Sequence, residues 1–229
     1  MQEQNFNMEE FFHQRMEEEW QNKRMRQRSL NPLAKKGQIL FTGSSLMEHF
    51  PVEELRMSMD VGPIIYNRGI GGFTTDEFLD NIGPMLLDLE PSKVFINIGT
   101  NDISDRFGAD GGWLVRLIEN YDKILARLKA ALPECRGYVM AYYPVNEAKI
   151  AESPWGRDAF GTRTNANVKR ANAEVEKLAA KFGYRYIDVN EGLTDADGNQ
   201  KEEYAVDGVH MRPAAYAVIL KNMLPYINE

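Results

Sequence analysis

Short apolar runs alternate with longer amphipathic segments along the chain from residue 37 onward. Each short run is too brief for a helix and ends at turn-forming residues, which is typical of a buried strand in a parallel sheet. The predicted strands cover residues 39–41, 64–66, 94–98, 138–141 and 184–187. The longer segments repeat their apolar positions with the helical period. They predict helices at 74–89, 113–132, 164–182 and 213–227.

This regular alternation predicts an α/β fold. A parallel sheet of five strands, covered by helices on both faces and joined by right-handed crossovers, is the arrangement that such an order favours. No internal repeat and no linker rich in Pro, Gly or Ser interrupts the pattern. Residues 37–229 are therefore expected to form one domain.

Residues 1–36 are expected to form a helical appendage to that domain. Met8, Phe12, Met16 and Trp20 recur every four residues and lie opposite three glutamates, which predicts a helix with one apolar stripe. We expect this stripe to be buried, either on the chain's own domain or on a second subunit of a homo-oligomer. The polar face is acidic in its first half, which argues against a helix lying on a membrane.

Composition and charge favour a small-molecule partner. The 229 residues carry a formal net charge of −7, and nucleic acids and anionic membranes would repel such a chain, so neither is expected as a partner. Cys135 is the only cysteine, which excludes an intrachain disulfide and a cysteine zinc site. The sequence has neither a secretory leader nor an apolar run of membrane length, so we expect a cytoplasmic protein.

Three consecutive predicted strands end in turns that carry polar residues or glycines. They lead into Ser44 and Ser45, into a glycine-rich turn at 67–74, and into a Gly-Thr-Asn-Asp turn that contains Asn101. Open α/β sheets bind ligands beyond the carboxyl ends of their strands. A hydroxyl, backbone N–H groups and a side-chain amide are therefore predicted to meet there. Judged alone, each serine is equally consistent with a helix cap, and the asparagine with a turn.

A hydroxyl nucleophile needs a base, and the chain has three histidines. His13 lies in the predicted appendage, and His49 lies four residues after Ser45, where we expect a surface or packing role. His210 comes just before the last predicted helix, and Asp207 precedes it by three residues, close enough to hold the imidazole in one tautomer. This pattern fits a nucleophile, a base and an orienting acid, although an Asp and a His capping a helix would look the same in isolation.

Other sites fit the sequence less well. Gly69 and Gly71 match two glycines of the dinucleotide fingerprint, but Thr74 stands where the third is required. The Gly-x-Ser-x-Gly elbow of α/β-hydrolases is absent. Residues 195–206 begin like a calcium loop but lack its closing glutamate, so a hairpin turn is expected there. We expect Cys135 to be a packing or surface thiol.

Taken together, the motifs resemble the SGNH hydrolases, also called GDSL esterases or lipases. Ser45 matches the nucleophile motif, Gly72 the conserved glycine motif, Asn101 an intact Gly-Thr-Asn-Asp, and Asp207 with His210 the Asp-x-x-His motif. The resemblance covers residues 39–228 and implies a flavodoxin-like three-layer α/β/α sandwich, with no metal and no organic cofactor. Ser44 replaces the motif's usual Asp, so we expect altered local hydrogen bonding there.

The resemblance also implies a role for each residue. Ser45, His210 and Asp207 would form a catalytic triad. The N–H groups of Ser45 and Gly72, together with the Asn101 amide, would form the oxyanion hole.

The substrate is expected to be a small-molecule ester with a short acyl chain, such as an O-acetyl group on a carbohydrate. The chain lacks a long apolar lid, which favours this over lipid aggregates. A lysophospholipase and a thioesterase are alternatives, and a non-catalytic ligand-binding protein is the alternative from another class. The loop at 142–163 is expected to form the pocket wall, with four candidate substrate-binding residues: Tyr142, Tyr143, Trp155 and Arg157.

Overall fold

The computed structural model describes residues 8–107, 111–152 and 154–229. Its centre is a five-stranded parallel sheet with the strand order β2-β1-β3-β4-β5. The strands are β1 (Ile39–Gly43), β2 (Ile65–Asn67), β3 (Lys93–Asn97), β4 (Arg136–Met140) and β5 (Arg185–Ile187). This arrangement confirms the predicted α/β sandwich, and each strand lies within three residues of its predicted position.

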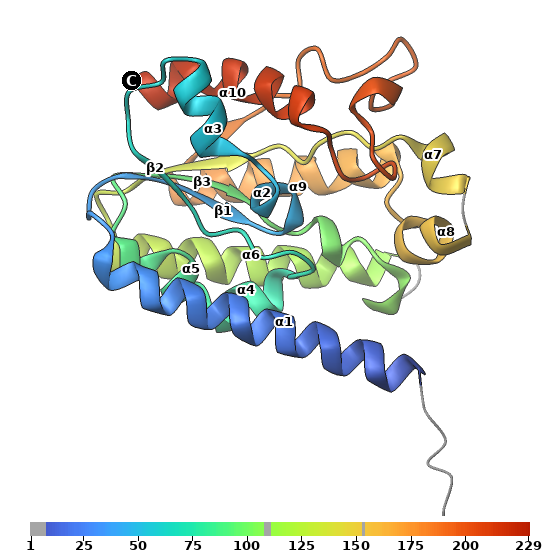
Figure 1. Cartoon of the computed structure of the whole chain (residues 1–229), viewed down its shortest axis with the longest axis horizontal. Helices are drawn as coiled ribbons and strands as arrows, with labels where there is room; N and C mark the ends of the chain where they lie inside the picture. Colours follow the sequence, from blue (N-terminus) through green and yellow to red (C-terminus); the bar gives the residue numbers. More distant parts are fainter. Residues whose placement is uncertain (1–7, 108–110, 153) are drawn as a thin grey trace, which may run out of the picture.

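Helices cover both faces of the sheet (Figure 1). One face carries α2 (Ser45–Glu48), α3 (Val52–Ser58) and α10 (Pro213–Asn228). The other carries α4 (Thr75–Asp80), α5 (Ile82–Met85), α6 (Gly112–Ala131) and α9 (Asn165–Phe182). In the part of the chain that the structure describes, no helix is both long and apolar enough to cross a membrane.

Alternate residues of each strand enter the two cores. Leu40, Val94 and Val139 face α6 and α9, and their neighbours Phe41, Phe95 and Tyr138 face α10. The aromatic row is in register across the strands, and the Phe95 and Tyr138 rings stack with centroids 4.5 Å apart. Because both faces are buried, the strands read as continuous apolar runs, which is the signal that located them.

The predicted helix at 74–89 is three pieces in the structure. A capping box formed by Thr74 and Glu77 opens α4, and the Asn81 N–H closes it on the Glu77 and Phe78 carbonyls. Helix α5 and a short 3₁₀ turn (Leu87–Leu89) follow. Pro84 has no N–H to continue the helical hydrogen-bond ladder, so the periodic apolar pattern is carried by separate short turns.

The loop expected at 142–163 contains two further helices, α7 (Glu147–Ala151) and α8 (Pro154–Phe160). Short 3₁₀ turns at Asn31–Leu33, Thr100–Asp102, Asp105–Phe107 and Glu202–Tyr204 complete the described elements. The hairpin expected near residue 197 is confirmed, because Thr194 and Gln200 form an antiparallel bridge.

The N-terminal helix α1 (Met8–Leu30) lies along the layer that contains α4 and α5 (Figure 1). Hydrogen bonds from three side chains join this segment to the domain. Trp20 donates to the Gly71 carbonyl, Gln27 to the Arg68 carbonyl, and Asn31, just beyond the helix, to the Pro84 carbonyl. Helix α1 is thereby fixed to the turn after β2 and, through Asn31, to α5.

The apolar stripe of α1 is only partly buried. Met8 and Met16 are 56% and 49% exposed in the single chain, so the expectation of burial on the chain's own domain is wrong for both. The side chain of Phe12 lies outside the described residues. Trp20, the last residue of the repeat, does pack on the domain: its ring meets Phe73 edge-on and its Nε1 donates to the Gly71 carbonyl. Burial of the stripe against a second subunit stays a prediction.

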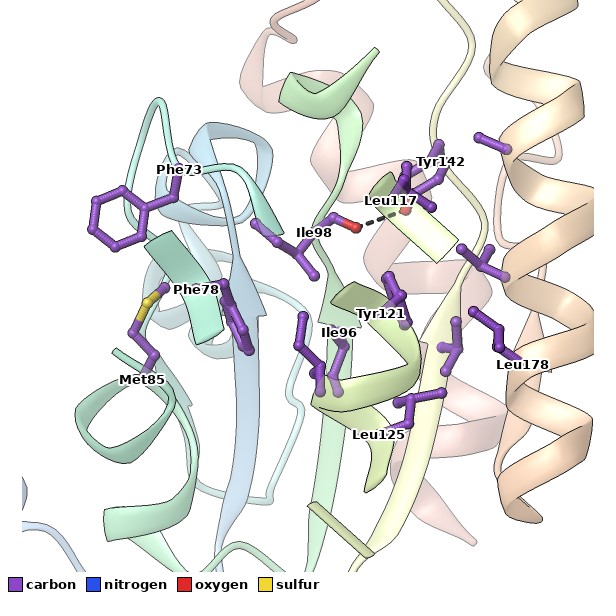
Figure 2. Packing of buried hydrophobic residues seen from close by; sticks show 14 of the residues in the cluster. Phe73, Phe78, Met85, Ile96, Ile98, Leu117, Tyr121, Leu125, Tyr142 and Leu178 are labelled. Carbon is purple, nitrogen blue, oxygen red and sulfur yellow. Dashed lines mark hydrogen bonds between the residues drawn. The ribbon is translucent and has the colours of Figure 1, made fainter. Parts of the chain in front are cut away.

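Tyr142 and Tyr143 are adjacent but enter opposite cores, and their hydroxyls differ in one respect. The Tyr142 hydroxyl donates to the Ile98 carbonyl at 2.7 Å (Figure 2). The Tyr143 hydroxyl is enclosed and has no hydrogen-bond partner among the described residues. An unpaired buried hydroxyl stabilises nothing, whereas removal of a paired one leaves a carbonyl unsatisfied.

We therefore expect Tyr142→Phe to lower the free energy of unfolding by about 1–3 kcal/mol. Tyr143→Phe should leave it within about 0.5 kcal/mol of wild type or raise it. Urea unfolding of the two single variants measures both values. Equal losses in the two variants would contradict this account of the hydroxyls.

Candidate active site

Ser45 stands where β1 turns into α2. The turn is tight because a Cβ on Gly43 would lie 2.0 Å from the Asn97 carbonyl oxygen, so only glycine fits beside β3. Ser45 is the first residue of α2 and is 9% exposed. Ser44 occupies the N-cap position but makes no capping bond, and its enclosed hydroxyl has no partner in the described chain. The two serines are thus in different environments.

His210 reaches Ser45 from the loop before α10. Its Nε2 lies 2.9 Å from Ser45 Oγ, and its Nδ1 lies 2.6 Å from Asp207 Oδ2. The other Asp207 oxygen accepts the backbone N–H groups of Val209 and His210 at 3.0 and 2.8 Å. Gly208 makes this turn with a φ of +94°, and a Cβ there would meet Ile150 at 2.6 Å. The spacing of three residues folds the carboxylate onto the imidazole, as the sequence predicts.

The hydrogen bonds of this turn keep Asp207 ionised. Burial raises its pKa, but the bonds from the His210 ring, the His210 N–H and the Val209 N–H outweigh that effect. The net result lowers the pKa of Asp207 to about 2. The carboxylate therefore stays negative beside His210 throughout the neutral and mildly acidic range.

Two further backbone and side-chain donors border Ser45. Gly72 lies in the turn after β2 with a φ of +81°, and its N–H, like that of Ser45, has no acceptor among the residues described. Asn101 donates one amide hydrogen to the Phe73 carbonyl at 2.9 Å, which leaves the second hydrogen unused. Gly72 and Asn101 line the same cavity as Ser45 and His210.

A fully buried carboxylate fixes the Asn101 turn to α4. Asp102 accepts the Thr75 N–H at 3.0 Å, the Thr75 hydroxyl, and Arg116 Nη1 at 3.2 Å. Burial raises the pKa of Asp102 to about 6, although the Thr75 hydrogen bonds oppose this shift. The buried Asp102 and the half-buried Asp207 are thus two carboxylates whose pKa values move in opposite directions.

The cavity around Ser45 has a volume of about 770 Å³. Four parts of the chain form its outer walls: α1, the 3₁₀ turn at Asp105–Phe107, α8, and the segment after α8. Their contributions include Met16, Arg106, Trp155, Arg157, Phe160 and Arg163. A cavity of this size is in the range of small-molecule sites and exceeds what an acetyl group alone would fill.

Two of the four predicted substrate-binding residues line this cavity, and two do not. Trp155 and Arg157 are exposed residues of α8 at the cavity. Tyr142 and Tyr143 are 1% and 2% exposed and belong to the two apolar cores. The prediction that they bind the substrate is therefore wrong. They follow β4 by two and three residues, and Tyr142 enters the core opposite to that of Met140, so the alternation of the strand has ended before them.

Some residues beside the site were not expected from the sequence. Met16 comes from the appendage, and Arg106 follows the Asn101 turn, but neither carries a pattern that distinguishes it. His49, expected to be a surface or packing residue, is exposed with its ring centroid 5.3 Å from that of His210. Partial desolvation of its ring and the neighbouring His210 lower the pKa of His49. Cys135, in contrast, is buried, and burial raises the pKa of its thiol to about 12.

Comparison with known proteins agrees with this geometry. The model of the GDSL-like Lipase/Acylhydrolase family matches residues 50–218. The chain belongs to this family. The resemblance noted in the sequence is therefore confirmed, and the chain is a member of a family of ester-hydrolysing enzymes. The match begins after Ser45, so the position of that serine rests on the motif and on the geometry described above.

Relatives of the GDSL-like chain span several organisms. A GDSL esterase/lipase of Arabidopsis thaliana is 25% identical over 170 residues, which cover 71% of this chain and 65% of that protein. The chain thus spans a little under two thirds of the length of this curated relative. A candidate platelet activating factor from Streptococcus pneumoniae has a solved structure with 27% identity and a TM-score of 0.82, covering 95% of this chain and 97% of that one.

Two more distant structures share the fold. An acetylxylan esterase from Geobacillus stearothermophilus has 16% identity and a TM-score of 0.62, with 85% of this chain and 95% of that chain covered. A candidate acylhydrolase from Bacteroides fragilis has 22% identity and a TM-score of 0.70, with 87% of this chain and 93% of that chain covered. Together with the five-stranded sheet, they confirm the fold class predicted for the GDSL-like chain.

The carboxylates of Asp207 and Asp102 predict opposite dependences of stability on pH. Since the folded-state pKa of Asp207 is depressed, its contribution is present above the unfolded value of about 3.9 and is lost as the pH falls through 2. The stability advantage of wild type over Asp207→Asn should therefore shrink between pH 5 and pH 3.

Asp102 provides the opposing control. Its folded-state pKa is raised, so wild type should lose stability relative to Asp102→Asn as the pH rises from 4 to 7. Urea unfolding of wild type and both variants between pH 3 and pH 7 measures the two differences. Parallel pH trends for the two variants would refute the assigned pKa directions.

Proposed function

We propose that this chain is a serine esterase that hydrolyses short-chain carboxylic esters through Ser45, His210 and Asp207. The observation that carries the proposal is the continuous hydrogen-bonded series from Asp207 Oδ2 through the His210 ring to Ser45 Oγ, with distances of 2.6 and 2.9 Å. A non-catalytic binding protein has no need of this series.

The proposed reaction has two halves. Ser45 Oγ attacks the acyl carbonyl carbon while His210 Nε2 accepts its proton, and His210 then protonates the departing alcohol. Water, deprotonated by His210, next attacks the acyl-enzyme and releases the carboxylic acid and free Ser45. Asp207, ionised and hydrogen-bonded to Nδ1, holds the ring with Nε2 toward Ser45 and stabilises the imidazolium.

Three donors would stabilise the oxyanion of each tetrahedral intermediate. The N–H groups of Ser45 and Gly72 and the second hydrogen of the Asn101 amide border the cavity without an acceptor in the described structure. Donors that are already oriented cost no reorganisation when negative charge develops on the carbonyl oxygen. Removal of one such donor typically lowers kcat by about 10² to 10³.

The substrate we favour is an O-acetyl or other short-chain ester of a carbohydrate or similar polar alcohol. An acetylxylan esterase shares the fold, and catalytic mutants of that enzyme replace a Ser or an Asp by Ala. The cavity of the present chain is wide and bordered by three arginines and two aspartates, and these polar groups suit a polar alcohol. A lysophospholipase or thioesterase activity is the alternative.

The two adjacent serines allow a matched test of the nucleophile. On p-nitrophenyl acetate, Ser45→Ala should lower kcat on the order of 10⁶-fold, because the nucleophile itself is removed. Ser44→Ala should stay within about threefold of wild type, because the Ser44 hydroxyl is enclosed and unpartnered. A rate that falls from acetate to butyrate to octanoate would support the short-chain assignment.

Fluorophosphonate labelling completes this test. Wild type and Ser44→Ala should be labelled at Ser45, and Ser45→Ala should not. Faster cleavage of octanoate than of acetate would favour the lipase or thioesterase alternative. Equal residual activity in wild type and Ser45→Ala, with no label on either, would leave the binding role as the better account.

A further inference from the structure

Arg163 is a buried cation in the wall of the Ser45 cavity. It is 7% exposed, and its Nε is enclosed with no hydrogen-bond partner among the described residues. Nor does a hydrogen bond or ion pair within that part of the chain engage its terminal nitrogens. An uncompensated buried charge is costly, and a folded protein normally supplies it with a partner.

The two carboxylates whose negative charge acts on Arg163, Asp207 and Asp102, already accept hydrogen bonds from other groups. Asp207 accepts bonds from His210 and Val209, and Asp102 accepts bonds from Thr75 and Arg116. Burial, with a smaller contribution from the positive charge of Arg106, lowers the pKa of Arg163 to about 10. The guanidinium therefore remains protonated at neutral pH.

The position of Arg163 is set by an aromatic ring that also borders the proposed base. Its Cζ lies 4.6 Å from the centroid of the Phe160 ring. The Phe160 ring in turn meets the His210 ring edge-on, with centroids 5.9 Å apart. The cation thus lines the same cavity as His210 and Ser45. Arg106 and Arg157 add positive charge at the exposed rim of this cavity.

We propose that Arg163 is an anion-binding subsite, and that the ester cleaved at Ser45 carries a carboxylate or phosphate group on its alcohol portion. This inference rests on the proposed esterase function. An acetyl or other simple alkanoyl group, as proposed above, carries no charge, so the anion is assigned to the alcohol. The planar guanidinium is suited to either oxyanion, since it can donate two parallel hydrogen bonds to both.

Matched substrates test the subsite. We would compare kcat/KM for mono-O-acetyl methyl glucuronoside, its neutral glucoside counterpart, and 1-acetylglycerol 3-phosphate. Wild type should prefer one of the two anionic esters over the neutral one, and the preferred ester identifies the anion as carboxylate or phosphate. Arg163→Gln should lower kcat/KM for that ester by about 10- to 100-fold, the range for a hydrogen bond between charged groups, and change the neutral ester by less than threefold.

The controls separate the subsite from the esterase function. Arg170→Gln removes an exposed arginine outside the cavity and should leave the preference unchanged, whereas Arg163→Lys should retain part of it. Ser45-dependent hydrolysis with equal rates on charged and neutral esters would overturn the subsite alone. Absence of Ser45-dependent hydrolysis on all three esters would overturn the esterase function.

A competition experiment covers the case in which Arg163→Gln does not fold. Inorganic phosphate or free methyl glucuronoside should inhibit wild-type hydrolysis of p-nitrophenyl acetate competitively, because they would occupy the guanidinium without reacting. Failure of both at millimolar concentration would overturn the proposal.

A second inference comes from helix α1. The peptide unit between Gly71 and Gly72 carries the Gly71 carbonyl on one side and the Gly72 N–H on the other, since the described chain has no cis peptide. Trp20 Nε1 donates to that carbonyl at 2.8 Å, and its indole covers Gly72 so closely that a Cβ there would lie 2.9 Å from the ring. The Trp20 bond thus fixes the carbonyl outward and leaves the opposite N–H facing the cavity.

The other side of Gly71 is also held from α1. Gly71 donates its N–H to Glu48 Oε2 at 2.7 Å. Glu48 in turn pairs with Lys23, with 2.9 Å between Lys23 Nζ and Glu48 Oε1. Both hydrogen-bonding groups of Gly71 are therefore set, directly or through one carboxylate, by residues one turn apart on α1.

From this we infer that Trp20 is a positioning residue for the oxyanion hole, supported by Lys23 one turn further along α1. The inference again depends on the proposed hydrolysis. Trp20→Phe keeps an aromatic ring against Phe73 but removes the N–H. It should lower kcat on p-nitrophenyl acetate by about 3- to 30-fold and leave KM within threefold, because the oxyanion is present only in the transition state.

Gln27→Ala is the matched control. Gln27 also joins α1 to a loop carbonyl, that of Arg68, but this carbonyl does not belong to the Gly71–Gly72 peptide. It should lower the urea midpoint as Trp20→Phe does and leave kcat unchanged. Equal kcat in Trp20→Phe and wild type, or an equal loss in Gln27→Ala, would overturn the inference. If Trp20→Phe does not fold, benzothienylalanine at position 20 removes the donor with the same ring shape and decides between the same outcomes.

Discussion

The parallel alignment of β1, β2 and β3 is the constraint on which the site depends. Because the three strands run in the same direction, their carboxyl ends open at one edge, and the turns that follow them bring Ser45, Gly72 and Asn101 to a single cavity. The strands approach closely enough that Gly43 has no room for a Cβ against Asn97. A Cβ on Gly69 would likewise lie too close to the backbone of Glu48. The glycines at these strand ends are thus required by packing before they serve any chemistry.

The part of the site that the sequence predicts is the part encoded in local spacing. The distance of three residues between Asp207 and His210 suffices to place a carboxylate on an imidazole, and a serine or asparagine directly after a buried strand is placed by the sheet. Tyr142 and Tyr143 show the limit of this reasoning. They also follow a strand, but the three residues beyond Met140 stay buried, and both tyrosines enter the cores even though the regular alternation of β4 has ended. An aromatic residue near a strand end gives no signal of where the pleat stops.

The rest could not be predicted because it depends on contacts between distant segments. The apolar repeat of α1 correctly indicates a helix, yet the orientation of that helix is decided by Trp20 and Gln27, whose partners are backbone carbonyls near residue 70. Every residue type has a backbone carbonyl, so the sequence around residue 70 does not predict these hydrogen bonds. The break between α4 and α5 is similar, since Asn81 and Pro84 interrupt the backbone ladder while the apolar period runs on.

The unsatisfied groups of the cavity share one chemical character. The N–H groups of Ser45 and Gly72, the second amide hydrogen of Asn101 and the guanidinium of Arg163 are all donors without an acceptor in the described structure. The carboxylates near them already accept hydrogen bonds: Asp207 from His210 and Val209, and Asp102 from Thr75 and Arg116. Folding a chain of net charge −7 into a site with surplus donors sacrifices stability unless something negative binds there. An oxyanion that develops during reaction would satisfy the three donors beside Ser45, but it is too localised to satisfy the guanidinium behind Phe160 as well. Two separate negative groups, one transient and one carried by the substrate, account for all four.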